Sequence, residues 1–195
     1  MAGNQAYKKL WTYRYTTIIY DLTAEFIKNF ILSRGNKNFS NLGLPDSRTA
    51  DQMNQAARSG KQNIVEGSEA MKTSLKSAVK LTNVARASIE ELLQDYEDFL
   101  RQHNFKVWSK EQENTKNIRE YFSRYVKGGD LSNLSILRNR LSKNTPEVAA
   151  NIVLTLCHQA TYLLNKQVEG MERKLIEEGG YSENICKKRK NFRGY

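Results

Sequence analysis

Residues 53–67 read MNQAARSGKQNIVEG, and this stretch decides the fold. Its apolar and small residues recur three and four positions apart, the period of an α-helix that buries one face. The members of this inner stripe are Met53, Ala56, Ala57, Gly60, Ile64 and Gly67. Because most of them are small, a neighbouring helix can approach unusually closely. A glycine inside a helix costs about 1 kcal/mol relative to alanine, so Gly60 in particular indicates close packing.

Further helices are predicted on both sides of this stretch. Residues 12–33 carry apolar side chains at helical spacing, and a polar loop with Gly35, Gly43 and Pro45 follows. Asp46 is the predicted N-cap of the helix that contains Gly60. We expect this helix to run to about Glu66, with Gly67 and the polar run after it ending the helix. Thr73 or Ser74 then caps a third helix, whose apolar positions continue to about Gln102.

The second half of the chain predicts one long helix preceded by shorter ones. Ser109 and Gln112 form a capping box for a helix that ends at Gly128 and Gly129. Leucines at 134, 137 and 141 have the spacing of another short helix. Thr145 and Pro146 are typical of a helix start, and the helix they open spans the 33 residues to Glu178. One short helix is expected around Ile185 in the tail.

These elements predict an all-α fold, because no strand-like alternation is present and 2 prolines and 11 glycines are too few for a sandwich or barrel. We expect an antiparallel up-and-down four-helix bundle with a helical insert and a C-terminal helical extension. Its first three helices occupy 1–108, the insert 109–145, the long fourth helix 146–178 and a basic tail 179–195.

Composition favours a cytoplasmic protein without a membrane partner. The chain has 195 residues, which suits one domain with an extension. No stretch approaches the roughly 20 apolar residues of a membrane span, and the N-terminus lacks the apolar region of a secretion signal. Cys157 and Cys186 belong to no disulfide or zinc motif. Cys157 is expected to be a small buried apolar residue.

Charge indicates an anionic partner, because 31 Lys and Arg outnumber 21 Asp and Glu and give a net charge of +10. Lys72, Lys76 and Lys80 are four residues apart, so we expect three like charges on one helix face, which a phosphate backbone would relieve. The second nucleic-acid-binding candidate is the tail cluster of Lys187, Lys188, Arg189, Lys190 and Arg193. The alternative interpretation is that both are only solvated faces.

The acidic residues have a separate place in the sequence. Between residues 87 and 100 the only charged residues are Glu90, Glu91, Asp95, Glu97 and Asp98, so the third helix changes sign along its length. One subunit's basic half could therefore meet another's acidic half in a head-to-tail contact that closes into a ring.

Aromatic residues near the N-terminus alternate with Lys and Arg residues. Tyr7, Trp11, Tyr13, Tyr15 and Tyr20 alternate with Lys8, Lys9 and Arg14, a mix that could stack on single-stranded bases. Packing of these rings against the helices or against another subunit is the favoured interpretation.

No motif for catalysis, metal or cofactor binding is found, and no small-molecule substrate is evident. Neither His103 nor His158 follows a glutamate three positions earlier, as a di-iron bundle requires. Glu66 and Glu90 are expected near the inward stripes, where a structural polar network is favoured over a catalytic pair. The residues assigned to that network and to helix packing are Gln52, Arg58, Gly60, Asn63, Glu66, Gly67, Arg86 and Glu90.

Several stretches resemble one family. These are RTADQMNQAARSGKQNIVEGS at 48–68, NVARASIEELLQDYEDFLRQ at 83–102, YDLTAEF at 20–26, and AANIVLTLCHQATYLLNKQVEGMERKLIEEGGYSEN at 149–184. They resemble the bacterial four-helix-bundle proteins first found encoded within intervening sequences of large-subunit ribosomal RNA genes, and the subgroup that carries a C-terminal suffix domain.

The resemblance implies an antiparallel bundle that forms homo-oligomeric rings, pentamers among them, and it supplies no catalytic residues. The family is similar in fold to accessory proteins of diversity-generating retroelements, which work with a reverse transcriptase and its RNA. We therefore expect a non-enzymatic oligomeric scaffold that binds RNA or a ribonucleoprotein, such as a reverse transcriptase complex, through its basic surface. The alternative is a protein interaction module or accessory subunit without nucleic-acid contact.

Overall fold

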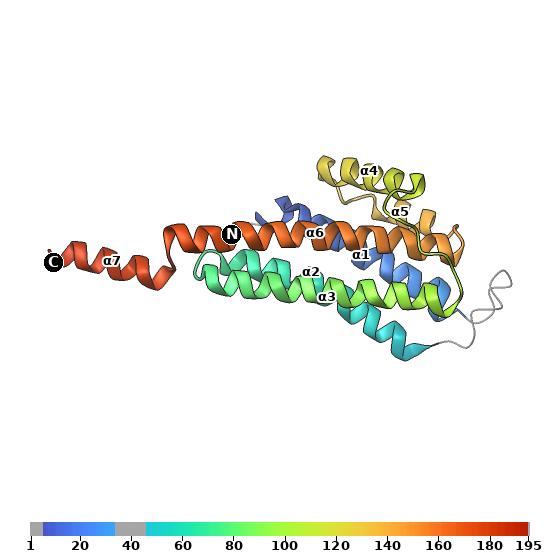
Figure 1. The fold of residues 1–195 in the computed structure, drawn as a ribbon, viewed down its shortest axis with the longest axis horizontal. Coiled ribbons are helices and arrows are strands. Elements are labelled where there is room, and N and C mark those ends of the chain that lie inside the picture. Colours follow the sequence, from blue (N-terminus) through green and yellow to red (C-terminus); the bar gives the residue numbers. More distant parts are fainter. Residues whose placement is uncertain (1–5, 34–45, 195) are drawn as a thin grey trace.

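The computed structural model describes residues 6–33 and 46–194, and this part of the chain is all-helical, without strands (Figure 1). The loop predicted around Gly35, Gly43 and Pro45 lies outside the described residues. The elements in chain order are η1 (Ala6–Lys9), α1 (Trp11–Phe26), the π-helical η2 (Ile27–Ile31), α2 (Ser47–Ala70), α3 (Leu75–Gln102), α4 (Glu113–Gly128), α5 (Leu134–Leu141), α6 (Pro146–Glu178) and α7 (Tyr181–Arg193).

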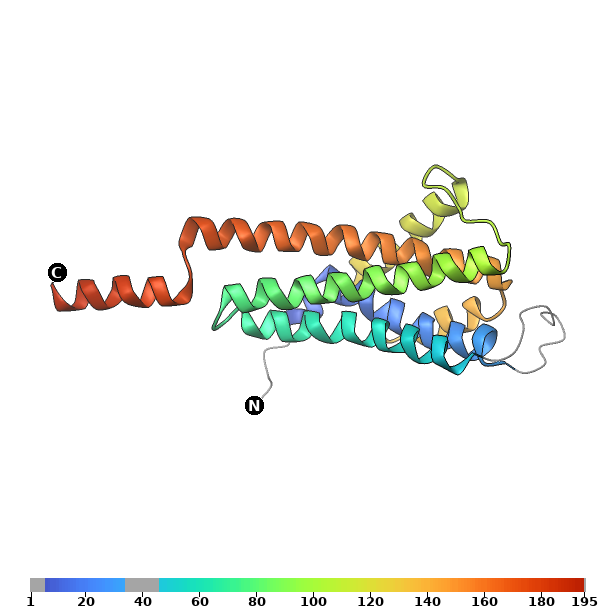
Figure 2. The ribbon, with the colours of Figure 1, turned by 60° about the horizontal axis from the view of Figure 1, so that its bottom comes forward.

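One hydrophobic core is shared by α1, α2, α3 and α6. Each of these helices packs against two others, in the cyclic order α1, α2, α3, α6, and neighbours run in opposite directions (Figures 1 and 2). A smaller cluster of Ala78, Val168 and Met171 closes the end where α3 begins and α6 finishes. No helix in the described residues has an apolar stretch long enough to cross a membrane.

Side-chain caps fix the starts of the three longest helices, as the sequence predicts. The Asp46 carboxylate accepts from the backbone N–H groups of Arg48 and Thr49 at 3.0 and 3.1 Å, and starts α2. Ser74 starts α3 in the same way. Thr145 starts α6, with Pro146 in its first turn. Each such cap stabilises its helix by about 1 kcal/mol.

The inner stripe of mostly small residues on α2 is buried against α3, which confirms the predicted close approach of the two helices. A Cβ atom added to Gly60 would lie 2.6 Å from Cδ1 and 2.9 Å from Cγ1 of Ile89. The helix ends later than the predicted position near Glu66, because it continues through Gly67 to Ala70 and the Met71 N–H donates to the Gly67 carbonyl. Gly67 serves packing instead, since its added Cβ would lie 3.2 Å from the Thr82 hydroxyl.

The predicted insert forms α4 and α5, which lie on the side of α1 and α6 (Figure 1). Contrary to expectation, it does not pack wholly outside, because the same hydrophobic core buries Phe122, Val126, Leu137 and Leu141. The start of α4 differs from the prediction, because the helix begins at Glu113. Only half of the capping box forms, with the Gln112 amide oxygen accepting from the Ser109 N–H at 2.9 Å. The end of α4 is as predicted, with Gly129 at a φ of 76°.

The final helix, α7, projects beyond the others (Figures 1 and 2). It follows α6 after a break at Gly179, whose φ of 75° favours glycine. The tail helix predicted around Ile185 is present and is 13 residues long. None of its described side chains is buried. A helix of this length without packing is only marginally stable by itself.

Candidate functional sites

The two basic clusters lie at the same end of the molecule. Figures 1 and 2 place the turn between α2 and α3 at the end where α6 finishes and α7 begins. Lys72, Lys76 and Lys80 are all exposed, and no ion pair within the described residues involves them. The prediction that the three lysines share one helix face is wrong, because Lys72 lies in the turn that precedes α3. The tail candidates on α7 are exposed as well, namely Lys187, Lys188, Arg189, Lys190 and Arg193.

The residues assigned to one polar network fall into two groups and a solvent-exposed remainder. Arg86 crosses to α6, where its Nη1 donates to Asn165 Oδ1 at 2.9 Å, and its Nε lies 3.9 Å from Glu90 Oε1. Asn63 donates to the Ser59 carbonyl at 2.9 Å. The Ser59 hydroxyl in turn bonds that of Ser88, which joins α2 to α3.

The other predicted members of the network lie on the outer surface. Gln52, Arg58 and Glu66 are exposed, and Glu66 accepts from Gln62 of its own helix at 3.2 Å. Glu66 faces solvent because Ile64 and Gly67 turn the inner face of α2 away from it. Its carboxylate therefore does not join that of Glu90, whose side chain is 46% exposed.

An acidic groove of about 440 Å³ separates the outer faces of α2 and α3. Its carboxylates are those of Glu91, Asp95 and Asp98, all on α3, while α2 contributes Gln52 and Gln55. Desolvation raises the pKa of Asp95 to about 6, and the charges of Glu91 and Asp98 act in the same direction. Cationic groups are favoured here, because a positive charge would relieve the repulsion among the three carboxylates.

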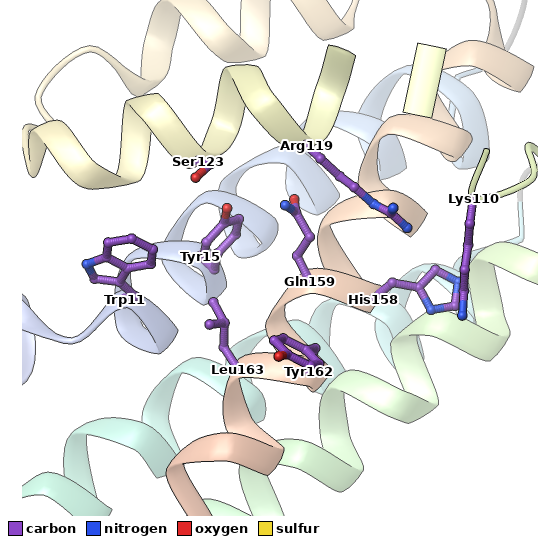
Figure 3. Close-up of a pocket in the computed structure, with 9 residues that line it drawn as sticks. All are labelled: Trp11, Tyr15, Lys110, Arg119, Ser123, His158, Gln159, Tyr162 and Leu163. Carbon is purple, nitrogen blue, oxygen red and sulfur yellow. The ribbon is translucent and has the colours of Figure 1, made fainter. Parts of the chain in front are cut away.

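A second hollow, of about 470 Å³, lies where α4 of the insert faces α1 and α6, and Figure 3 shows its lining. Trp11 and Tyr15 come from α1, and Leu163 from α6 lies on their side of the pocket. Arg119 of α4 and Lys110 of the preceding loop lie on the other side, near His158. The pocket therefore has an aromatic end and a cationic end.

Polar groups occupy the middle of this pocket. Gln159 projects between the two ends in Figure 3, and its Oε1 is buried without a hydrogen-bond partner in the described residues. Desolvation lowers the pKa of His158, the carboxylate of Glu97 opposes this effect, and Lys110 and Arg119 add to it. The described residues contain no group of three or more His, Cys, Asp or Glu that could hold a metal ion.

Sequence reasoning missed this pocket, although one signal pointed toward it. Trp11 and Tyr15 belong to the N-terminal aromatic run that could stack on bases, but the cations at the other end of the pocket come from segments more than ninety positions later. His158 is exposed on α6, whereas Cys157 is buried in the core as expected.

Comparison with known proteins identifies no relative: no family model, no curated protein and no solved structure matches the chain.

Proposed function

We propose that this protein is a non-enzymatic homo-oligomeric scaffold that binds RNA, or a ribonucleoprotein such as a reverse transcriptase complex, through its basic end. The proposal places it in the cytoplasm and in the ribosomal RNA intervening-sequence family that it resembles. It classifies α1, α2, α3 and α6 as an antiparallel up-and-down four-helix bundle. Residues 109–145 are then a helical insert, and 179–195 a C-terminal extension.

The observation that carries the RNA proposal is the basic, projecting helix α7. Its five Lys and Arg side chains are all exposed, and the only acidic residue in the helix is Glu183, in the first turn. Like charges on a short, unpacked helix repel one another, so a polyanion would stabilise it. Phosphates supply this charge along a nucleic acid, and the exposed lysines at 72, 76 and 80 extend the basic surface at the same end.

Salt dependence provides a quantitative test. If all eight candidate side chains contact phosphates of a single strand, the slope of log K against log salt is about −5 to −6, since each contact contributes about −0.7. Fluorescence anisotropy with a labelled RNA between 50 and 300 mM KCl measures this slope. Changing the five Lys and Arg residues of the tail to Gln should make this slope less negative by about 3 to 4.

A matched control separates a specific surface from general positive charge. Lys28, Lys106 and Lys143 are exposed and lie near the end of α1, the end of α3 and the start of α6, opposite the basic end (Figures 1 and 2). Changing all three to Gln therefore removes as much charge as changing Lys72, Lys76 and Lys80. We expect the variant at Lys72, Lys76 and Lys80 to lose RNA affinity and the control variant to retain it. Absence of RNA binding, binding that is insensitive to salt, or equal losses in both variants would refute the RNA proposal.

Self-association is the second part of the proposal, and it is supported by the opposite charges on α3. Lys76 and Lys80 lie near its start, whereas the acidic groove with Asp95 lies in its second half. A head-to-tail contact between a basic and an acidic half closes into a ring when its rotation permits. Light scattering after size exclusion should give a multiple of the 22.5 kDa chain mass at micromolar concentration, and a monomer would overturn this part.

A protein interaction module is the rival function, favoured by exposed apolar side chains at the same end. Ile176 is 83% exposed and Phe192 is 93% exposed, on either side of the break before α7. A partner with acidic and apolar groups could cover them without any nucleic acid. Capture of a protein partner from lysate that survives nuclease treatment supports the rival, whereas loss on nuclease treatment supports the RNA proposal.

A further inference from the structure

The pocket between α1, α4 and α6 combines features that one class of ligand would satisfy together. Its volume of about 470 Å³ lies in the range of small-molecule sites. Figure 3 shows an indole and a leucine at one end, two basic side chains at the other, and an amide between them. A matching ligand has a flat apolar part, polar atoms along its edge and an anionic group beyond.

The amide of Gln159 points to a ligand with hydrogen-bonding edges. Its Oε1 is buried and unpartnered in the described residues, and a buried polar atom without a partner costs about 1 to 3 kcal/mol. A ligand that donates to this oxygen would remove that cost. Because an amide also carries donors, Gln159 matches the alternating donors and acceptors of a base edge.

The cationic end points to a phosphate. Arg119 is half-buried, Lys110 is exposed, and no ion pair within the described residues involves either. A guanidinium presents N–H groups in a fork that fits phosphate oxygens, and an ammonium adds a point charge. The described lining of the pocket contains Lys110 and Arg119 and no carboxylate, and the nearby carboxylate of Glu97 acts on His158.

We propose that this pocket binds one nucleotide, with its base against Trp11, the base edge hydrogen-bonded to Gln159, and its phosphate at Arg119 and Lys110. Trp11 is 44% exposed, so its ring is accessible for stacking. The nucleotide can be a free nucleoside monophosphate or one unit of an RNA strand, since both present the same base and phosphate. Only the RNA form rests on the proposed function above.

Isothermal titration calorimetry with AMP, GMP, CMP and UMP tests the proposal directly. We expect at least one monophosphate to bind, and its nucleoside to bind about tenfold more weakly because it lacks the phosphate. Arg119→Gln should weaken the monophosphate about tenfold and change the nucleoside less than twofold. Gln159→Leu should weaken both, because it removes the contact with the base. Arg138→Gln, an exposed arginine of α5 outside the pocket, is the matched control and should bind as the unchanged protein does.

Inorganic phosphate and a five-nucleotide RNA complete the test. Inorganic phosphate that binds as tightly as the monophosphate would overturn the proposal, because it would mean a site without base recognition. No heat with any monophosphate at 1 mM, together with unchanged RNA affinity in Arg119→Gln, would also overturn it. RNA binding that needs Arg119 while monophosphates fail supports the RNA form. The variant with five neutralised tail residues should keep monophosphate binding even where it loses RNA, so the two proposals fail separately.

Discussion

Replacing Gly60 with alanine tests the close packing of α2 on α3. The new methyl would lie 2.6 Å from Ile89 Cδ1, nearer than Cβ contacts occur in proteins. Ile89 is fully buried and β-branched, so its side chain has little room to turn away. Overpacking costs about 1 to 3 kcal/mol. Two atoms of Ile89 lie within 3.0 Å of the new methyl, so we expect the upper half of this range, about 2 to 3 kcal/mol, from which alanine returns about 1 kcal/mol of helix propensity. We therefore expect Gly60→Ala to destabilise the protein by about 1 to 2 kcal/mol.

Urea unfolding followed by far-ultraviolet circular dichroism measures this change. A chain of this size unfolds with a slope of about 2 to 3 kcal/mol per molar urea, so the midpoint should fall by about 0.5 M. Gly170 supplies the control, because it lies on an exposed part of α6 and an added Cβ meets nothing within 4 Å. Gly170→Ala should leave stability unchanged or raise it by up to about 1 kcal/mol.

The double variant assigns the cost to Ile89. Ile89→Val removes Cδ1 and costs about 0.5 to 1.5 kcal/mol by itself. In that background, Gly60→Ala should cost at least about 1 kcal/mol less than in the original chain, because the nearest clashing atom is gone. If Gly60→Ala is as stable as the original protein, or if Ile89→Val does not change its cost, the two helices are not held at this distance and the reasoning fails.

Three smaller effects follow from individual side chains. Folding raises the pKa of Asp95 from 3.8 to about 6, so the protonated carboxyl contributes stability that is fully present below pH 3.8 and is lost as the pH rises through 6. Because solvent screens this half-exposed site, we expect the loss to be about 1 kcal/mol. Asp95→Asn should remove this loss, and parallel stability profiles from pH 4 to 8 would contradict it. Asp46→Ala deletes the cap of α2 and should cost about 1 kcal/mol in urea unfolding, whereas an unchanged midpoint would speak against the cap. A thiol reagent should modify Cys186 quickly and Cys157 only after unfolding, because burial raises the pKa of the Cys157 thiol, and two fast thiols would show that the core opens.

Helix starts could be predicted from sequence because they depend on local chemistry. Asp46, Ser74 and Thr145 each cap the backbone a few residues away, so the signal and the structure it produces are adjacent. The predicted end of α2, near Gly67, is too early, because the sequence does not distinguish a glycine that ends a helix from one that permits close helix packing. The widened turn of η2 also left no signal, because its apolar residues keep ordinary helical spacing.

The candidate sites were predictable only where they are continuous in sequence. The tail cluster lies within one helix, so its charge could be read directly. The pocket was not predictable, because it forms where Arg119 on the insert meets Trp11 and Gln159 on α1 and α6. Nothing in the sequence specifies which side of the other helices the insert covers. Lys72 shows the same limit on a smaller scale, since a four-residue spacing implies one face only if the helix is unbroken.

The difference between the two cysteines has a practical consequence for studying α7. Cys186 lies in that helix directly before Lys187, and it is exposed, while Cys157 is enclosed by the core. A maleimide dye would therefore place a single optical reporter on α7 without any mutation. Energy transfer from that dye to a labelled oligonucleotide, or to a dye on a second chain, would measure directly what approaches this helix.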